Sequence, residues 1–350
     1  MNLGLRELRE FLQQHKNDQS LVLATVTAIR GSSYRKPGAM MLIRKNGEYA
    51  GLISGGCLEA DLIEHASLVF ESGKPLQLTY DLSIDDEAIW GLGLGCGGAV
   101  HLLLQRLDAD QEFGFLPALF DSTDRRDRRQ ACILALAHRE IDDIPAGSWA
   151  IQSGRSKGLG NAFILGALKG GLDRWNGPGR FSYAGSEESV LLLKIEPPPR
   201  VLVCGAGPDA IPMARQVDAL GWECIVVDHR SAFARPERFP ASCRVLRLEA
   251  GQLQEQVELD RLSAAIVMSH NLEHDATYLQ QLVSKNLAYL GLLGPKARRL
   301  QLQKDLNFED RLIHGPVGFD IGAELPEAIA LSVMAEIHAV LAGKLGSVDI

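Results

Sequence analysis

The chain has 350 residues, of which 46% are apolar and 23% are charged, and its formal net charge is −8 at pH 7. This length favours two domains in a soluble globular protein. The negative charge provides no overall basic field for nucleic acid, and the apolar runs are too short to cross a bilayer. Residues 1–15 have the leucine spacing of an amphipathic helix, which does not fit a signal peptide. We therefore expect a cytoplasmic protein, without nucleic-acid or membrane partners, whose six scattered cysteines are free thiols.

The first hundred residues alternate between apolar runs and turn residues, which predicts a mixed α+β domain. In chain order the pattern indicates a strand over 21–29, a hairpin over 40–53, a helix over 58–72, and strands over 76–82 and 99–104.

Two cysteines of this region lie in glycine-rich segments. Gly55 and Gly56 precede Cys57, and Gly97 follows Cys96. Glycine lets the backbone approach a ligand closely, and successive amides in such a loop can bind an anion and favour a thiolate. The pair of loops predicts a site for an anionic, sulfur-seeking ligand. The alternative is that both cysteines are small core residues beside tight turns.

Two cations lie in the loop between the first two predicted strands. Arg35 and Lys36 precede a Pro-Gly turn, and cations near a thiol suit a ligand that carries phosphate or dithiolene groups. The alternative is that they are ordinary exposed residues of a hairpin.

A run of three prolines over 197–199 marks the predicted domain boundary, because consecutive prolines form a stiff extended spacer. We assign residues 1–196 to the N-terminal domain and 200–350 to the C-terminal domain. Within the first, residues 108–195 are rich in strand and loop signals, with strands expected over 131–137, 149–153 and 189–195.

The C-terminal domain alternates apolar strands with helices. Strands are expected over 201–204, 224–228, 244–246, 264–268 and 288–292, and helices over 211–220 and 325–342. This alternation predicts a Rossmann-like, doubly wound parallel sheet, so the fold class of the whole chain is α/β.

A glycine turn after the first of these strands has the pattern of a dinucleotide-binding fingerprint. Gly205, Gly207 and Ala210 open the following helix, and Asp228 ends the next strand. Such glycines let a pyrophosphate reach the helix N-terminus, and the acid binds a ribose hydroxyl. Arg230 is placed to meet a phosphate instead. The alternative is a Rossmann fold whose nucleotide site is vestigial or used differently.

Residues 270–274 have the H-x-x-E-H spacing of one class of zinc peptidase. We reject a zinc site because the segment begins at a strand end rather than within a helix. The carboxyl ends of parallel strands bind ligands, so His270, His274 and Asp275 are predicted to border a ligand site. The alternative is a helix N-terminus with ordinary polar caps.

These motifs together resemble the XdhC/CoxI family, whose members are accessory proteins of molybdenum hydroxylases such as xanthine dehydrogenase. The segments that carry the resemblance are 31–39, 55–59, 95–98, 205–210, 228–230, 269–270 with Asp275, 291–294 and 315–327.

The resemblance implies a maturation chaperone rather than an enzyme. It would bind the molybdenum cofactor, as molybdopterin or its cytosine dinucleotide form, support its sulfuration with a cysteine desulfurase, and insert it into an apo molybdenum hydroxylase. It places Cys57 and Cys96 as ligands at the metal or dithiolene and Arg35 and Lys36 at anionic groups.

For the C-terminal domain, fold analogy suggests that the cytidine nucleotide of the cofactor, or a separate NAD(P), binds there. A homodimer is also expected. Two alternatives stay open: an NAD(P)-dependent oxidoreductase, and a nucleotide-sensing adaptor with structural cysteines. The sequence shows no convincing proton donor for the first of these.

Overall fold

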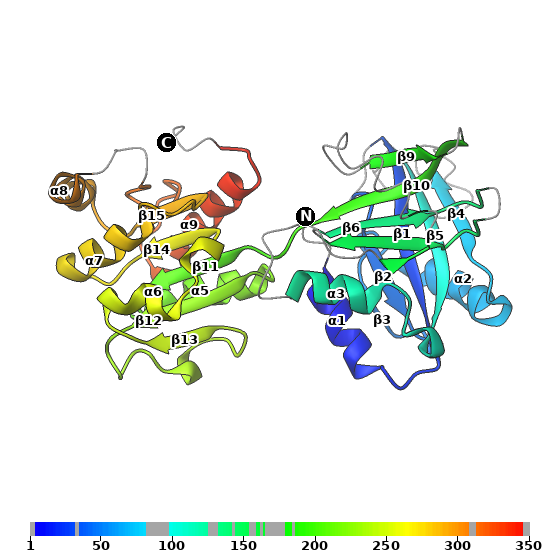
Figure 1. The fold of residues 1–350 in the computed structure, drawn as a ribbon, viewed down its shortest axis with the longest axis horizontal. Coiled ribbons are helices and arrows are strands. Elements are labelled where there is room, and N and C mark those ends of the chain that lie inside the picture. The colour runs from blue at the N-terminus through cyan, green and yellow to red at the C-terminus, as the bar shows by residue number, and fades with distance from the viewer. Residues whose placement is uncertain are drawn as a thin grey trace. The chain divides into compact units, whose positions relative to one another are not determined.

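The computed structural model describes residues 4–31, 35–81, 98–124, 132–141, 144–153, 159–161, 164, 179–183, 186–307 and 313–345. The chain divides into two compact units, Met1–Pro197 and Pro198–Ile350. The first contains antiparallel sheets with helices, and the second a parallel sheet between helices (Figure 1). The predicted α/β fold class is confirmed. Within the described ranges, no helix is both long and apolar enough to span a membrane.

The first unit is built on two antiparallel five-stranded sheets. The strands of the first sheet are β1 (Ser20–Gly31), β2 (Met40–Ile43), β3 (Tyr49–Gly51), β4 (Leu76–Asp81) and β5 (Gly98–Asp108), in the order β3-β2-β1-β5-β4. Those of the second are β6 (Cys132–Ala137), β7 (Trp149–Ser153), β8 (Leu159–Gly160), β9 (Gly179–Tyr183) and β10 (Ser186–Ile195), in the order β8-β7-β6-β10-β9.

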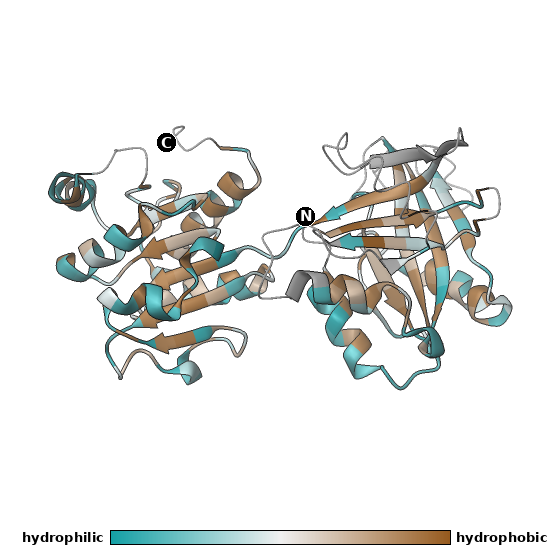
Figure 2. Ribbon diagram, in the orientation of Figure 1, coloured by the Kyte–Doolittle hydropathy of each residue, from teal (hydrophilic) through white to brown (hydrophobic). Residues whose placement is uncertain are grey.

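Apolar side chains of three helices close the core of this unit. They are α1 (Leu5–Gln14), α2 (Glu59–Ser72) and α3 (Leu116–Asp124). Leu8 of α1 and Leu119 of α3 share one buried cluster with residues of both sheets. The opposite face of the first sheet packs on Leu62 and Val69 of α2. Figure 2 shows the hydrophobic residues concentrated on the strands and on the sheet-facing sides of the helices.

The second unit is an open parallel sheet. Its strands are β11 (Arg200–Cys204), β12 (Glu223–Asp228), β13 (Arg244–Arg247), β14 (Ala264–Val267) and β15 (Tyr289–Leu292), in the order β13-β12-β11-β14-β15. Its helices are α5 (Ala210–Ala219), α6 (Leu253–Gln256), α7 (Leu272–Leu282), α8 (Lys296–Leu306) and α9 (Pro326–Leu341).

Alternate residues of the central strand pack on different helices. Val201 and Val203 share a cluster with α5 and α9, whereas Leu202 and Cys204 share one with α6, α7 and α8. The helices therefore cover both faces, which is the doubly wound arrangement predicted. The strand order reverses between β11 and β14, and the carboxyl edge at such a reversal is where open α/β sheets bind ligands.

A buried carboxylate joins α9 to the loop that precedes it. Glu336 is 1% exposed and accepts hydrogen bonds from the Tyr289 hydroxyl (2.7 Å) and the Gly318 amide (2.6 Å). His314 Nδ1 lies 2.8 Å from the other carboxylate oxygen. Burial opposes ionisation, but the hydrogen bonds with His314, Tyr289 and Gly318 hold the pKa of Glu336 below its ordinary value.

This lowered pKa predicts a pH dependence of stability. A carboxyl group whose pKa falls on folding stabilises the protein fully above its unfolded pKa, about 4.3, and loses that contribution as the pH falls through the folded pKa. We expect Glu336→Gln to lower the free energy of unfolding by about 2 kcal/mol at pH 7 and to flatten its decline in acid. Urea denaturation from pH 7 to pH 3 measures both. The control is Glu327→Gln, an exposed position on α9; if it matched Glu336→Gln, the network would have no such role.

Candidate functional site

The connections that carry the N-terminal motifs leave the first sheet at one end. Gly31, the last residue of β1, pairs with Gly98, the first residue of β5. Met40 begins β2 toward the same end but pairs with Thr25, six residues before Gly31, and Gly51 ends β3 beside it, paired with Met41. The connections over 32–39, 52–58 and 82–97 therefore leave their strands in the same direction, although they lie far apart in the sequence.

The predicted site residues of this unit belong to those three connections. Arg35 is partly exposed and Lys36 is exposed, and the Gly38 amide donates to the Val26 carbonyl (2.8 Å), which ties their loop to β1. Cys57 is a partly exposed free thiol. Cys96 and Gly97 lie outside the described residues, in the segment that joins β4 to β5.

A buried carboxylate, which the sequence did not reveal, organises the Cys57 loop. Glu59 is 2% exposed, and its side chain accepts hydrogen bonds from the amides of Ile53 (3.1 Å) and Ser54 (2.7 Å) and from the Ser54 hydroxyl (2.5 Å). Burial opposes ionisation, but these hydrogen bonds hold the pKa of Glu59 below its ordinary value. The serine stands five residues before the glutamate, so the pair does not match the S-x-x-E capping signature that would have drawn attention to it.

Three of the amides that were expected to bind an external anion are engaged within the loop, so their anion contact stays a prediction, which requires these bonds to be exchanged. The amides of Gly56, Cys57 and Leu58 lie 3.2, 2.9 and 3.0 Å from the Ser54 hydroxyl oxygen, which accepts from them. These backbone amides are hydrogen-bonded within the loop, because the Ser54 hydroxyl oxygen and the Glu59 carboxylate lie at its centre. Among the described residues, no atom lies within 4 Å of where a Cβ of Gly55 or Gly56 would stand, so this side of the loop is open toward them.

In the second unit, the glycine turn lies at the carboxyl edge, between β11 and β14. Gly205 has φ of +117°, and a Cβ there would be 2.5 Å from the Met268 carbonyl oxygen at the end of β14. Only glycine permits this approach. Gly207 accepts a hydrogen bond from the amide of Ala210 (3.1 Å), the buried first residue of α5.

Asp228 lies at the end of β12 beside this turn, but its carboxylate is engaged. It is 2% exposed and accepts from the Ala206 amide (2.8 Å), the Arg230 amide (2.9 Å) and the Arg230 guanidinium (2.7 and 2.9 Å). Burial opposes ionisation, but the bonds from Arg230 and Ala206 hold the pKa of Asp228 below its ordinary value. In this arrangement the Asp228 carboxylate stabilises the glycine turn through its hydrogen bond with the Ala206 amide. Its predicted contact with a ribose hydroxyl stays a prediction, which requires these bonds to be exchanged.

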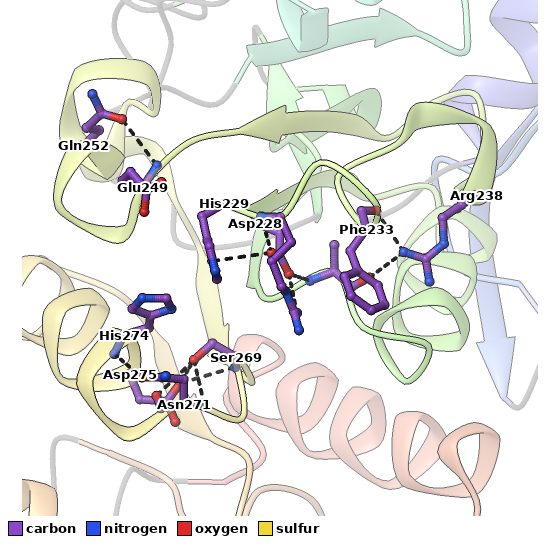
Figure 3. A network of polar contacts seen from close by, with 12 residues as sticks. Asp228, His229, Phe233, Arg238, Glu249, Gln252, Ser269, Asn271, His274 and Asp275 are labelled. Atoms are coloured by element: carbon purple, nitrogen blue, oxygen red, sulfur yellow. Dashed lines mark hydrogen bonds and ion pairs between the residues drawn. The ribbon is translucent and has the colours of Figure 1, made fainter.

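Two arginines complete the support of the turn. The Arg230 guanidinium lies over the Phe233 ring, 4.2 Å from its centroid. Arg238 donates to the carbonyls of Ala206 (2.8 Å) and Phe233 (2.9 Å), as Figure 3 shows for the latter contact. The Ala206 peptide is therefore held at both its amide and its carbonyl, so the turn is preorganised.

His270 reaches the same turn from the end of β14. Its Nε2 lies 2.6 Å from the carboxylate of Asp209, and its side chain is 61% exposed. The residue has φ of +58°, an uncommon conformation for a side chain other than glycine. The structure thus brings Gly207, His270 and Asp209 together. No sequence pattern indicated a role for Asp209, because only the fold brings it close to a histidine 61 residues away.

The other predicted site residues at the carboxyl edge of the sheet form a second group of side chains in contact with one another. Asp275 is fully buried and accepts from the Ser269 hydroxyl (2.5 Å) and from Arg298 (2.6 and 3.0 Å). The rings of His229 and His274 meet edge to face, 4.4 Å apart (Figure 3). Across the part of the chain that the structure describes, no three metal-ligating side chains are grouped to hold a metal.

Comparison with known proteins agrees with this architecture. A family model for the XdhC Rossmann domain matches residues 201–337, and the model of the XdhC and CoxI family matches residues 14–81. A Bacillus subtilis (strain 168) protein, named as a probable subunit of xanthine dehydrogenase, is 30% identical, over 92% of this chain and 93% of its own length. The chain belongs to the XdhC and CoxI family.

Two further relatives of this XdhC/CoxI protein extend over nearly its whole length. The Escherichia coli (strain K12) molybdenum cofactor insertion chaperone PaoD is 25% identical, over 95% of this chain and 87% of its own. A crystal structure from Bacillus halodurans, described as a xanthine dehydrogenase, has a TM-score of 0.81 at 27% identity, covering 99% of this chain and 98% of that one. The family models include the Cys57 loop and the glycine turn but not residues 82–200, so Cys96 lies outside both matches.

Proposed function

We propose that this XdhC/CoxI protein is a maturation chaperone that binds the molybdenum cofactor, supports its sulfuration and inserts it into an apo molybdenum hydroxylase of the xanthine dehydrogenase type. The observation that carries the proposal is that the connections containing Arg35–Lys36, Cys57 and Cys96 all leave the strands of the first sheet in the same direction. The name of the Escherichia coli relative supports the choice of cargo.

The residue types in these three connections suit the molybdenum cofactor as a ligand. The molybdenum cofactor combines a soft, sulfur-rich metal centre with an anionic phosphate, and thiolates are ligands that soft metals prefer. We assign Cys57 and Cys96 to the metal or dithiolene, Arg35 and Lys36 to the anionic groups, and the open side of Gly55 and Gly56 to close approach. A cysteine desulfurase would supply the sulfur, and a homodimer is the proposed assembly.

We assign the nucleotide part of the cofactor, or a separate NAD(P), to the carboxyl edge of the second unit. Gly205 and Gly207 open α5, and the free amides at a helix N-terminus favour a pyrophosphate. Arg230, beside the turn, would have to exchange a bond with Asp228 for one with the ligand. His270, hydrogen-bonded to Asp209, lies at the same turn.

Retention of molybdopterin tests the proposal. Purified protein is mixed with mature cofactor, desalted, and assayed for bound pterin and molybdenum. We expect retention by the wild type and a loss of about tenfold or more in affinity in Cys57→Ala and Cys96→Ala, since removing one metal contact costs at least about 1.4 kcal/mol.

The matched control is Cys132→Ala, which removes a buried thiol from β6 of the other sheet. It should retain the cofactor as the wild type does. Absence of retention by folded wild-type protein would overturn the proposal, and an equal loss in all three variants would remove the assignment of Cys57 and Cys96.

An NAD(P)-dependent oxidoreductase is the second candidate, and the His270–Asp209 pair favours it. The pair places a histidine, a common proton donor, at the edge where a nicotinamide cofactor would bind. This alternative predicts a substrate-dependent change in nicotinamide absorbance that His270→Gln abolishes. A chaperone would bind molybdopterin without any such change.

A further inference from the structure

Cys224 and Cys243 are neighbours at the amino ends of two adjacent parallel strands. Ile225 of β12 pairs with Arg244 of β13, so the residues that precede them lie side by side. The two thiols make a side-chain hydrogen bond, and both belong to the apolar cluster that packs against α5 and α9. Adjacent strands are about 4.8 Å apart, within the Cα separation of about 4.4–6.8 Å that a disulfide spans.

The surroundings give the two sulfurs different access to solvent. Cys224 is 3% exposed, whereas Cys243 is partly exposed and precedes the outermost strand of the sheet. The Ser242 hydroxyl donates to Asp218 (2.5 Å), which fixes the residue before Cys243 against the end of α5. The hydrogen bond with Cys243, together with burial, raises the pKa of Cys224 well above its ordinary value. Cys224 therefore keeps its proton, and Cys243 is the sulfur that a reagent in solution reaches.

We propose that Cys224 and Cys243 form an oxidative modification site, a dithiol that hydrogen peroxide converts into an intramolecular disulfide. In the first step the Cys243 sulfur attacks the peroxide, an S–O bond forms, the O–O bond breaks, and water leaves with the thiol proton. In the second step the Cys224 sulfur attacks the sulfenic sulfur, an S–S bond forms, the S–O bond breaks, and a second water leaves. Two thiols are oxidised by two electrons, and one peroxide is reduced to two waters.

The bond would lock the edge strand β13 to β12 at the end opposite the glycine turn, because parallel strands share their amino ends. It would form without a large backbone movement, since the register already places the two residues together. This chemistry does not depend on which cofactor the protein carries.

Peptide mapping of the oxidised full-length chain tests the proposal. Reduced, desalted protein is treated with hydrogen peroxide, alkylated, and digested with trypsin without reduction. Trypsin cleaves after Arg230 and Arg238, which lie between the two cysteines, so the disulfide would appear as two joined peptides. We expect that species in the wild type, with a loss of two alkylatable thiols per chain.

Two variants make the test specific. Cys57→Ser, which removes another partly exposed thiol, should give the same joined peptides. Cys224→Ala should leave Cys243 as a sulfenic acid that dimedone labels. The proposal is overturned if folded wild-type protein accumulates sulfinic acid at Cys243 without the link, or joins Cys243 to a different cysteine. The wild-type result decides the matter even if Cys224→Ala does not fold.

Discussion

Gly205→Ala is expected to lower the free energy of unfolding of the second unit by about 4 kcal/mol, because the substitution combines a disallowed backbone conformation with a backbone clash. The residue has φ of +117°, and the added Cβ would lie 2.5 Å from the carbonyl oxygen and 2.8 Å from the carbonyl carbon of Met268. Neither atom can move as a side chain would. Relief requires that the ends of β11 and β14 separate, which disrupts the turn beside Asp228 and His270.

Urea denaturation of the full chain measures this loss, and Gly251→Ala is its matched control. Gly251 lies in the same unit, and no atom of the residues that the structure describes stands within 4 Å of where its Cβ would be. The control should change stability by no more than about 0.5 kcal/mol. If the two variants were equally stable, β11 and β14 would not approach each other as described.

Glu59→Gln is expected to lower the free energy of unfolding of the first unit by about 3 kcal/mol, because it removes a buried charge that several donors surround. The Glu59 carboxylate accepts from the amides of Ile53 and Ser54 and from the Ser54 hydroxyl. The glutamine side chain would place its own N–H donors against some of these donor groups, where the carboxylate accepts hydrogen bonds. The substitution also removes the carboxylate at the centre of the Cys57 loop, which holds the Ser54 hydroxyl in place. We therefore expect faster hydrogen exchange at the amides of residues 56–58, which donate to that hydroxyl.

The comparison variant is Glu64→Gln, an exposed glutamate of the same helix. It should change neither the unfolding free energy nor hydrogen exchange in the loop. The difference between wild type and Glu59→Gln should shrink in acid, because the stabilisation from a carboxylate with a lowered pKa is lost as the pH falls through that pKa. A difference that is constant down to pH 3 would contradict the role of the charge.

Most of the strands and helices could be predicted from the sequence, because apolar periodicity records which residues face a core. The run over 21–29 is β1, and the alternation after the prolines is the doubly wound sheet. The glycine turn at Gly205 was recognisable for the same local reason, since a strand, a turn and a helix follow one another directly over residues 200–219. Residues 154–158 and 165–178, where glycine, serine and asparagine dilute that periodicity, lie outside the described residues.

The composition of the candidate sites was also predictable, but their internal bonding was not. The sequence marks Cys57 and Asp228 as unusual, yet it treats the amides of the one and the carboxylate of the other as free for a ligand. In the folded chain the Ser54 hydroxyl oxygen accepts from the Cys57 amide, and Arg230 and the Ala206 amide donate to the Asp228 carboxylate. A buried polar group must find a partner, and the sequence alone does not identify which neighbour supplies it.

The two kinds of domain, the glycine-rich motifs and the family that they resemble are readable from the residues alone. These depend on residue type and spacing along the chain. The pairings of distant residues became visible only in the folded chain: His270 lies beside Asp209, and Cys224 lies beside Cys243. Such contacts depend on strand order and register, which the packing of whole elements fixes and which no local pattern records.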